Sequence, residues 1–352
     1  MTGFLTILSA GPQLTLQDLG RTGYLAFGLT RGGAADVLAL HEGAALLGQD
    51  PSSAALEMTG MGGTFQSDTD IVIALTGAEM TADIDGARLL WNASQTLPAG
   101  ATLKIGGATQ GTYGYLSVAG GFDTPLQMGA RSSHLTAGVG APLESGTRLP
   151  LGGNPAARAG QYLDPAPRLS GGDVRVMPSV QTEQFAPEVR ARFADAAFRR
   201  DARGNRQGVR MDFDGEGFFA EGGLSIVSEV ILEGDIQITG DGAPYVLMCE
   251  CQTTGGYPRI GTVIPSDLPR VAQASVGAPL RFRFVSWEEA RGAEQAARAS
   301  LKALGCSSLS WTARRNRLSS ITRSGRGATR TALCFPVHHE QMPHPSSRTS
   351  SK

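Results

Sequence analysis

Cysteine, histidine and aromatic side chains are scarce in this sequence of 352 residues. Four cysteines without regular spacing exclude a disulfide framework, and no Cys or His cluster has zinc-site spacing, so we predict no metal site. Aromatic residues make up only 6% of the chain, which gives no indication of a nucleic-acid stacking platform. No apolar run reaches the roughly 18 residues of a membrane helix, and Met1 is not followed by a signal-like segment. We therefore expect a soluble, cytoplasmic protein that does not bind a membrane.

Several motifs for nucleotide, biotin and acyl chemistry are also absent. No G-x-x-x-x-G-K-[ST] sequence occurs, which excludes a Walker-type ATP site, and no lysine lies between two methionines, as a biotin-carrier segment requires. The G-x-S-x-G motif is missing too, which disfavours a serine hydrolase built on Asp123, Ser132, Ser133 and His134. A reaction that uses ATP or biotin would therefore need another chain or an unusual nucleotide site.

Charge is divided unevenly along the chain. Residues 307–352 hold eight of the 31 basic residues and one of the 32 acids, which leaves 23 bases and 31 acids in residues 1–306. A mildly acidic body gives no reason to expect nucleic acid as a partner. The tail at 306–352 is rich in serine and arginine and lacks hydrophobic periodicity, so we predict that it is disordered.

Glycine, by contrast, is abundant, with 47 residues, roughly twice the usual frequency of about 7%. Without a three-residue period, this abundance indicates many tight turns. Runs rich in Val, Ile, Thr and Tyr that end at glycines, such as 69–77, 101–107 and 113–121, predict strands. The pattern favours a mainly β fold, an antiparallel barrel or sandwich, over a Rossmann sheet.

A few helices and one linker complete the predicted organisation. Residues 152–172 are rich in glycine and proline and predict a linker between an N-terminal domain, 1–151, and a C-terminal domain, 173–305. The expected helices lie at 35–48 with Asp36 as cap and Gly48 as its end, at 182–198 with an interruption, at 267–274 with Asp267 as a cap, and at 287–304 after a strand at 279–287.

The stretch CECQTTGGYP, residues 249–258, is the first candidate site. It follows an apolar strand, and its hydroxyls and glycine N–H groups suit an anion or a carbonyl oxygen that gains charge. Gln252 and Gln273 have paired donors and acceptors for a planar amide. The alternative is a merely structural turn. The candidate residues here are Glu250, Gln252, Thr253, Thr254, Gly255, Gly256 and Tyr257.

Arginines in two other glycine-rich stretches are candidate carboxylate clamps. Arg21 and Arg31 lie within residues 15–40, and Arg131 lies within residues 120–135. Guanidinium binds carboxylate in a bidentate manner, so we predict that these three side chains bind substrate carboxylate or phosphate. Surface ion pairs are the alternative interpretation.

Six ordered motifs together resemble one known family over about residues 4–290. They are TLQDLGR, GGAAD, SAALEMTGMGG, LTGA, YLSVAGGFDTPLQMGARSS and QTTGGYP with VIPSDLPRVAQ. The chain is identified by them as similar to the biotin-dependent carboxyltransferase family, formerly called allophanate hydrolase subunit 2, which includes KipA and the C subunit of bacterial 5-oxoprolinase. The resemblance implies a fold of two cyclophilin-like β-barrel domains with a few short helices.

The resemblance also implies an activity and partners. It implies ATP-dependent opening of the 5-oxoproline (pyroglutamate) lactam to L-glutamate, with an A subunit and a KipI-like B subunit, and a chain that is inactive alone. ATP, with Mg²⁺, would be bound through the complex, and no biotin would be attached to this chain. Two alternatives stay open. One is the carboxyltransferase part of a urea-carboxylase-like biotin enzyme, and the other is a KipA-like regulator that antagonises a KipI-like kinase inhibitor.

We predict that Glu250, Thr253 and Thr254 have catalytic roles at the reacting centre; the alternative is that they belong to a barrel rim or to the subunit interface. Two departures from the family pattern stand out: Glu250 replaces an aspartate, and Gln207 replaces a methionine within GNRQGVRM. One added methylene moves a carboxylate by about 1 Å, and such a displacement costs on the order of a hundredfold in rate. The predicted substrate-binding residues are Arg21, Arg31, Arg131, Gln252, Gly255, Gly256 and Tyr257.

Overall fold

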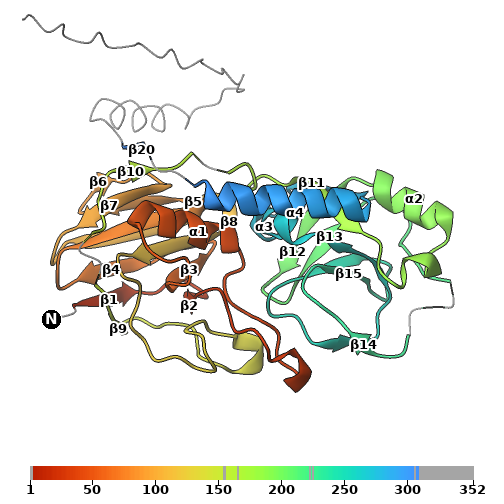
Figure 1. Cartoon of the computed structure of the whole chain (residues 1–352), viewed down its shortest axis with the longest axis horizontal. Coiled ribbons are helices and arrows are strands. Elements are labelled where there is room, and N and C mark those ends of the chain that lie inside the picture. The colour runs from red at the N-terminus through yellow and green to blue at the C-terminus, as the bar shows by residue number, and fades with distance from the viewer. Residues whose placement is uncertain are drawn as a thin grey trace, which may run out of the picture.

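The computed structural model describes residues 3–153, 156–164, 166–221, 223, 226–304 and 307–308. Two β structures lie side by side, with a long helix along one face of both (Figure 1). The prediction of a mainly β fold with a few helices is confirmed. Within the described part of the chain, no helix is long and apolar enough to span a bilayer. The predicted disorder of the tail concerns residues that lie outside the described ones, apart from 307–308.

The N-terminal half is an 11-stranded sheet whose main path runs β20-β10-β7-β5-β8-β4-β1-β9 in the described residues. In addition, β3 pairs with β2 and β8, and β6 pairs with β5. The strands are β1 (Phe4–Ser9), β2 (Thr15–Gln17), β3 (Ala55–Thr59), β4 (Thr64–Ser67), β5 (Ile71–Ile84), β6 (Ala87–Arg88), β7 (Ala93–Leu97), β8 (Thr102–Val118), β9 (Arg148–Pro150), β10 (Gln161–Tyr162) and β20 (Ser307–Ser308).

Strand β8 corrects one prediction from the sequence. The separate strands expected over 101–107 and 113–121 are a single strand, because the glycine-containing segment between them continues the ladder with β5. The pairing of β5 with β8 contains three register shifts between Gly77 and Ala82. Bulges of this kind absorb extra residues and bend a strand without ending it. Glycine-rich sequence was therefore the wrong indicator of a turn here.

The C-terminal half is a closed barrel with the strand order β11-β18-β15-β16-β13-β12-β19. A separate pair, β14 with β17, lies at one end of it (Figure 1). The barrel strands are β11 (Gly172–Met177), β12 (Phe198–Gly204), β13 (Gly208–Asp212), β15 (Asp235–Ile238), β16 (Pro244–Leu247), β18 (Arg259–Val263) and β19 (Pro279–Phe284), and the pair is β14 (Glu229–Val230) and β17 (Thr254–Gly255).

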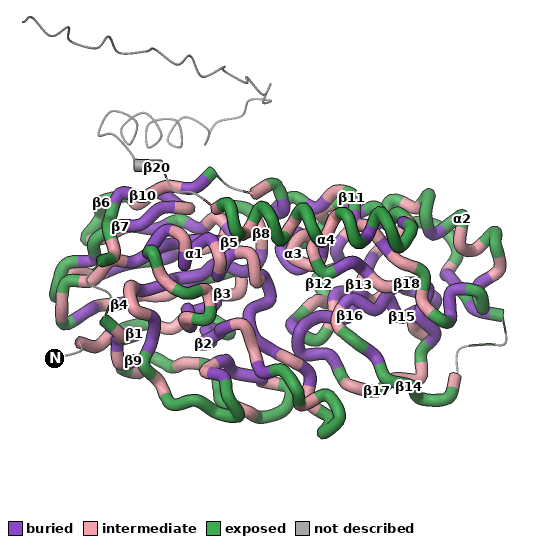
Figure 2. The backbone as a smooth tube through the Cα atoms, viewed as in Figure 1, coloured by how far each residue is buried: buried purple, intermediate pink, exposed green. Residues whose placement is uncertain are grey.

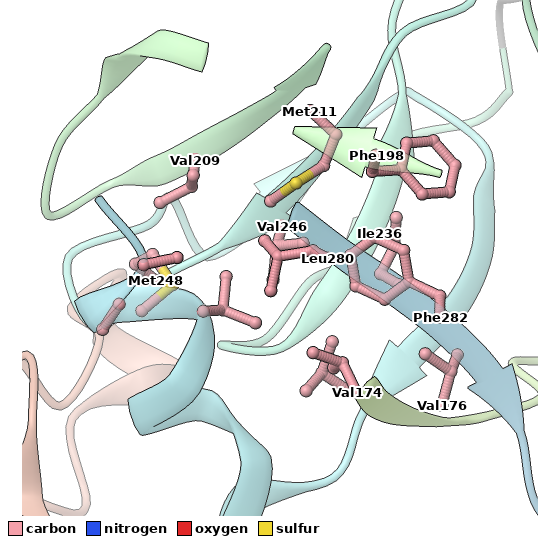
Figure 3. Close-up of a cluster of buried hydrophobic side chains, with 14 of the residues drawn as sticks. Val174, Val176, Phe198, Val209, Met211, Ile236, Val246, Met248, Leu280 and Phe282 are labelled. Atoms are coloured by element: carbon pink, nitrogen blue, oxygen red, sulfur yellow. The ribbon is translucent and has the colours of Figure 1, made fainter. Parts of the chain in front are cut away.

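The barrel encloses an apolar core in which alternate residues of its strands point inward (Figure 3). Alternation along β19 places Leu280 and Phe282 inside, at 0% and 1% exposure, as a period of two requires. The ring of Phe193 stacks on Phe282 with centroids 5.4 Å apart. The same buried cluster extends to Tyr113 and Tyr115 of β8, whereas the rest of the N-terminal half has a separate core of its own.

Helices cover the faces that the strands leave open. Helix α1 confirms its predicted ends, since the Asp36 side chain accepts from the N–H of Ala39 and Gly48 adopts a left-handed conformation. Asp267 precedes α3 without a capping hydrogen bond, because its carboxylate binds Arg175 instead. The helical elements are η1 (Leu25–Phe27), α1 (Val37–Leu47), η2 (Leu135–Ala137), η3 (Thr182–Gln184), α2 (Pro187–Asp195), η4 (Pro265–Asp267), α3 (Leu268–Gln273) and α4 (Trp287–Lys302).

Buried polar contacts join the two halves. Gln273, at the end of α3, is 0% exposed; its Oε1 accepts from the N–H groups of Thr112 and Tyr113, and its Nε2 donates to Asp36. Arg168, within the predicted linker, donates to Asp36 and to both oxygens of Glu42. Buried backbone, drawn in purple, lies in the middle of the molecule where the two halves meet (Figure 2). This buried seam places loops from both halves side by side.

Candidate functional site

Glu250 lies at this seam, in the loop that follows β16. Backbone hydrogen bonds tie the loop to the β12–β13 hairpin, because the N–H of Met248 donates to Gln207 O and that of Glu250 donates to Arg206 O. The Glu250 side chain is buried, at 2% exposure, and does not face open solvent. The predicted catalytic carboxylate is therefore held inside the protein by the hairpin that carries the GNRQG sequence.

Both carboxylate oxygens of Glu250 have hydrogen-bond donors. Oε1 accepts from Nε of Arg206 at 2.6 Å, and Oε2 accepts from the backbone N–H and the hydroxyl of Thr136, each at 3.1 Å. Burial opposes the negative charge, but the Arg206 guanidinium and these hydrogen bonds outweigh it and lower the pKa of Glu250. Glu250 is consequently an ionised acceptor and is poorly suited to donate a proton.

Arg206 links Glu250 to the N-terminal half. Its Nη1 donates to Glu57 of β3, and its Nη2 donates to the carbonyl of Gly33. Glu57 in turn accepts from the hydroxyl of Tyr115 at 2.6 Å. The Arg206 and Glu57 side chains are 6% and 1% exposed, so one cation is buried between two carboxylates. Such a network holds its geometry strongly, because loss of one partner leaves a buried charge without compensation.

His134 lies on the other side of Glu250. Its Nδ1 accepts from the N–H of Ala137 at 3.3 Å, which places the ring proton on Nε2, 2.9 Å from the hydroxyl of Thr30. Burial lowers the pKa of His134, so the ring is neutral near pH 7. Nδ1 is 3.9 Å from Glu250 Oε2, beyond hydrogen-bond distance. Among the described residues, the hydrogen-bond partner of His134 Nε2 is therefore the hydroxyl of Thr30 and not that of a serine, so His134 has no serine to activate here.

The three predicted arginine clamps lie close along the backbone, since the N–H of Arg21 donates to Arg31 O and its Nη2 donates to Ser132 O, next to Arg131, but the three side chains contact different groups. Arg31 donates to Glu233 at 3.0 Å, and Arg131 to Asp123 at 3.2 Å. Arg21 is 2% exposed and donates through Nη2 to the carbonyl of a neighbouring serine, whereas its Nε and Nη1 have no hydrogen-bond partner among the described residues. Burial lowers the pKa of Arg21. Arg21 and Arg31 both lie near the Glu250 network, because Glu250 influences the pKa of Arg21 and Arg206 influences the pKa of Arg31.

The remaining predicted residues form the outer part of the loop. Gln252 and Thr254 are exposed, Tyr257 is 44% exposed, and Thr253 is partly buried. Thr254 and Gly255 form β17, which pairs with β14, while Gly256 O accepts from the N–H of Ile226. The stretch after Glu250 is therefore a β-paired surface loop, with one wall of a pocket at its start.

This pocket has a volume of about 550 Å³ and lies between the β12–β13 hairpin and residues 251–252. Its lining includes an apolar group, formed by Ile231, Leu247 and Cys251, which pack together. Gln207 connects the pocket to the buried network, because it lines the pocket and donates through Nε2 to the Thr136 hydroxyl at 2.9 Å. The hydroxyl of Thr136 donates to Glu250, so a short chain of hydrogen bonds runs from the pocket to the buried carboxylate.

Reasoning from the sequence missed several members of this site. Glu57 is the one charged residue in the strand ALEMT, and a charge on a buried strand is a usable signal. Arg206 and Gln207 were noted within GNRQGVRM without a role in the site. Thr136 carried no signal, because only the fold brings residue 136 to residue 250. Among the described residues, no three His, Cys, Asp or Glu side chains converge as metal ligands.

Known proteins are similar to this chain over most of its length. Residues 27–284 match the family model described as carboxyltransferase domain, subdomain A and B. The chain is 34% identical to the C subunit of 5-oxoprolinase from Escherichia coli strain K12, over 83% of this chain and 94% of that one, and 33% identical to its Haemophilus influenzae counterpart, over 81% and 93%. Its structure is similar to that of the K. lactis urea amidolyase, with 25% identity and a TM-score of 0.75, over 86% of this chain and 20% of that one. The resemblance seen in the motifs is thus confirmed, and the chain belongs to the carboxyltransferase-domain family that contains the C subunit of 5-oxoprolinase.

Proposed function

We propose that this chain is the C subunit of an ATP-dependent 5-oxoprolinase that opens the lactam of 5-oxoproline to give L-glutamate, together with the A and B subunits. The observation that carries the proposal is the identity of 34% to the E. coli C subunit over 94% of its length. An alignment that spans nearly the whole relative leaves no large region of that relative without a counterpart here.

The chemistry requires help at the lactam carbonyl. Amide resonance makes this carbon a poor electrophile, and phosphorylation of the lactam oxygen by ATP makes it open to attack by water. In total, 5-oxoproline, ATP and two waters give glutamate, ADP and phosphate. Donors fixed in place before the reaction stabilise the charge that develops on such an oxygen. The pocket beside Gln252, whose polar lining is mainly uncharged, supports a role of this chain in holding the lactam.

Glu250 acts in this proposal as a positioning residue. Its lowered pKa and its fully occupied oxygens favour a role through the groups that it holds, Arg206 and Thr136, and through Gln207 at the pocket wall. The hydroxyls of Thr253 and Thr254 lie further along the same loop, and their predicted catalytic role is retained as part of the proposal.

ATP, with Mg²⁺, is bound through the complex in this proposal. The sequence has no Walker-type motif, and no metal-ligand cluster occurs in the described part of the chain. Calorimetric titration of ATP into the chain alone and into the assembled complex tests this assignment. Tight binding of ATP by the isolated chain would contradict it.

The function is tested by measuring glutamate released from 5-oxoproline and ATP in mixtures of this chain with candidate A and B subunits. Activity is expected only when all three are present. An inert complete mixture, in which this chain still binds its partner, would contradict the 5-oxoprolinase assignment.

Similarity to urea amidolyase favours one other function, the carboxyltransferase part of a biotin enzyme that acts on urea or a similar amide. The K. lactis urea amidolyase contains a region of this fold that accounts for 20% of its chain. This function predicts activity that depends on bicarbonate and on a separate biotinylated carrier protein. Omission of bicarbonate from the mixture distinguishes it, because 5-oxoproline opening would continue.

A further inference from the structure

The pocket beside Gln252 has walls rich in uncharged amides. Asn205, Gln207, Gln237 and Gln252 line it above the apolar group of Ile231, Leu247 and Cys251. Burial raises the pKa of the Cys251 thiol to about 12, so this group stays neutral at pH 7. The lining cation, Arg203, makes a two-point contact with Asp201, at 3.0 and 2.6 Å. The pocket therefore offers hydrogen-bonding groups and apolar surface with little net charge.

Two of the four wall amides, Asn205 and Gln207, have protein partners. Oδ1 of Asn205 accepts from the N–H groups of Gln207 and Gly208, at 2.8 and 3.3 Å. Nε2 of Gln207 donates to Thr136 at 2.9 Å. These bonds fix the hairpin and leave those atoms less free for a ligand.

Gln237 differs from them. It lies on β15, it is 7% exposed, and its Nε2 is buried without a hydrogen-bond partner among the described residues. A buried amide N–H without an acceptor is unfavourable, because it has lost its hydrogen bonds to water and gained none in the protein. Because this nitrogen makes no hydrogen bond to the rest of the described chain, rotating it toward the pocket breaks none. Buried polar groups of this kind in a protein mark a place for a water or a ligand.

Because Gly255 has no side chain, there is space beside it for the side-chain amide of Gln237. A Cβ added to Gly255 would lie 2.6 Å from Nε2 of Gln237 and 3.0 Å from Cδ1 of Ile231, closer than side chains tolerate. The backbone of Gly255 is not in a left-handed conformation, so its turn does not require glycine. One glycine of the QTTGGYP stretch is thus explained by the space needed for the Gln237 side chain.

We propose that this pocket binds the uncharged planar amide of a lactam or cyclic-urea ring, and that Gln237 donates a hydrogen bond to the ring carbonyl. The ring would lie on Ile231, Leu247 and Cys251, and any carboxylate on the ligand would remain at the rim, where Arg203 lies. The inference rests on the proposed function, since it names the part of this chain that holds the lactam.

The experiment is a binding titration of the full chain with 2-pyrrolidinone, an uncharged lactam, and with L-5-oxoproline, followed by ligand-observed NMR. In Gln237→Leu, binding of both should weaken about tenfold, which is ~1.4 kcal/mol. The thermal midpoint should stay the same or rise, because the variant removes a buried donor that has no partner. A merely structural glutamine would show the reverse, lower stability with unchanged binding.

Two further variants complete the test. Gly255→Ala keeps Gln237 but displaces its amide, so binding should weaken here too. Gln110→Leu removes an exposed glutamine in the other half of the molecule and should leave binding unchanged.

The outcomes separate the inference from the proposed function. If the wild-type chain binds neither probe, or if Gln237→Leu binds as well as wild type, the pocket does not hold the ring and the inference is wrong. Turnover of 5-oxoproline by the mixture of all three chains would then still support the proposed function. If the probes bind through Gln237 but the complete mixture is inert, the pocket stands and the 5-oxoprolinase assignment fails.

Discussion

Replacement of Arg206 by methionine is expected to destabilise the whole protein. Arg206→Met keeps a long apolar stem but removes the one cation that contacts both Glu57 and Glu250, whose side chains are 1% and 2% exposed. Breaking a buried ion pair by removing one partner costs about 3–5 kcal/mol, because an uncompensated charge remains. With two carboxylates left, we expect a loss of unfolding free energy at or above the upper end of that range.

Urea unfolding at pH 7 measures this loss. Trp91 is 8% exposed in the N-terminal half, so its fluorescence reports on that half, while circular dichroism follows the entire β structure. Arg203→Met is the matched control, because Arg203 lies in the same hairpin and pairs with Asp201, but its side chain is 67% exposed. Exposed pairs contribute about 0–1 kcal/mol, so this control should hardly change the unfolding midpoint. Equal losses in the two variants would refute the role assigned to the buried network.

The loss of unfolding free energy in Arg206→Met should also depend on pH. In the wild type the folded pKa of Glu250 is lowered, so its carboxylate stabilises the native state above the unfolded value of about 4.3, and this stabilisation is lost as the pH falls through the folded pKa. Without Arg206, burial instead raises the pKa of this carboxyl. As the pH falls, the carboxyl becomes protonated, the uncompensated buried charge disappears, and the variant is less destabilised. The difference in stability between wild type and variant should therefore shrink from pH 7 toward pH 4. A difference that stays constant would contradict the electrostatic explanation.

Three further predictions concern other buried groups. Glu250→Gln in the mixture of all three chains should lower glutamate release on the order of a hundredfold with little change in assembly of the complex, and full activity would rule out its positioning role. Gln273→Leu leaves the N–H groups of Thr112 and Tyr113 without an acceptor and should cost about 2–6 kcal/mol in urea unfolding; Gln110→Leu is the control. Burial raises the pKa of the Cys249 and Cys251 thiols to about 12, so iodoacetamide at pH 8 should label them only in denaturant, as peptide mass spectrometry would show.

Local signals in the sequence were good predictors where one short segment decides its own structure. Asp36 and Gly48 give both ends of α1, and alternation of apolar residues gives β19. The same kind of signal failed at β8, because pairing with β5 over a long ladder outweighed the preference of the glycines for a turn. The sequence pattern predicted that Asp267 caps a helix. Its carboxylate instead forms an ion pair with Arg175, which is distant in the sequence.

The sequence by itself determined the family and the mainly β architecture, because each depends on residue types and order along the chain. Only the tertiary structure decided what Glu250 contacts. Its partners come from positions 136 and 206, and Glu57 lies at the far side of Arg206. Contacts between residues so distant in the chain arise from packing of the two halves, which no local pattern encodes. For the same reason, the free amide of Gln237 beside Gly255 became visible only when both lay at one pocket wall.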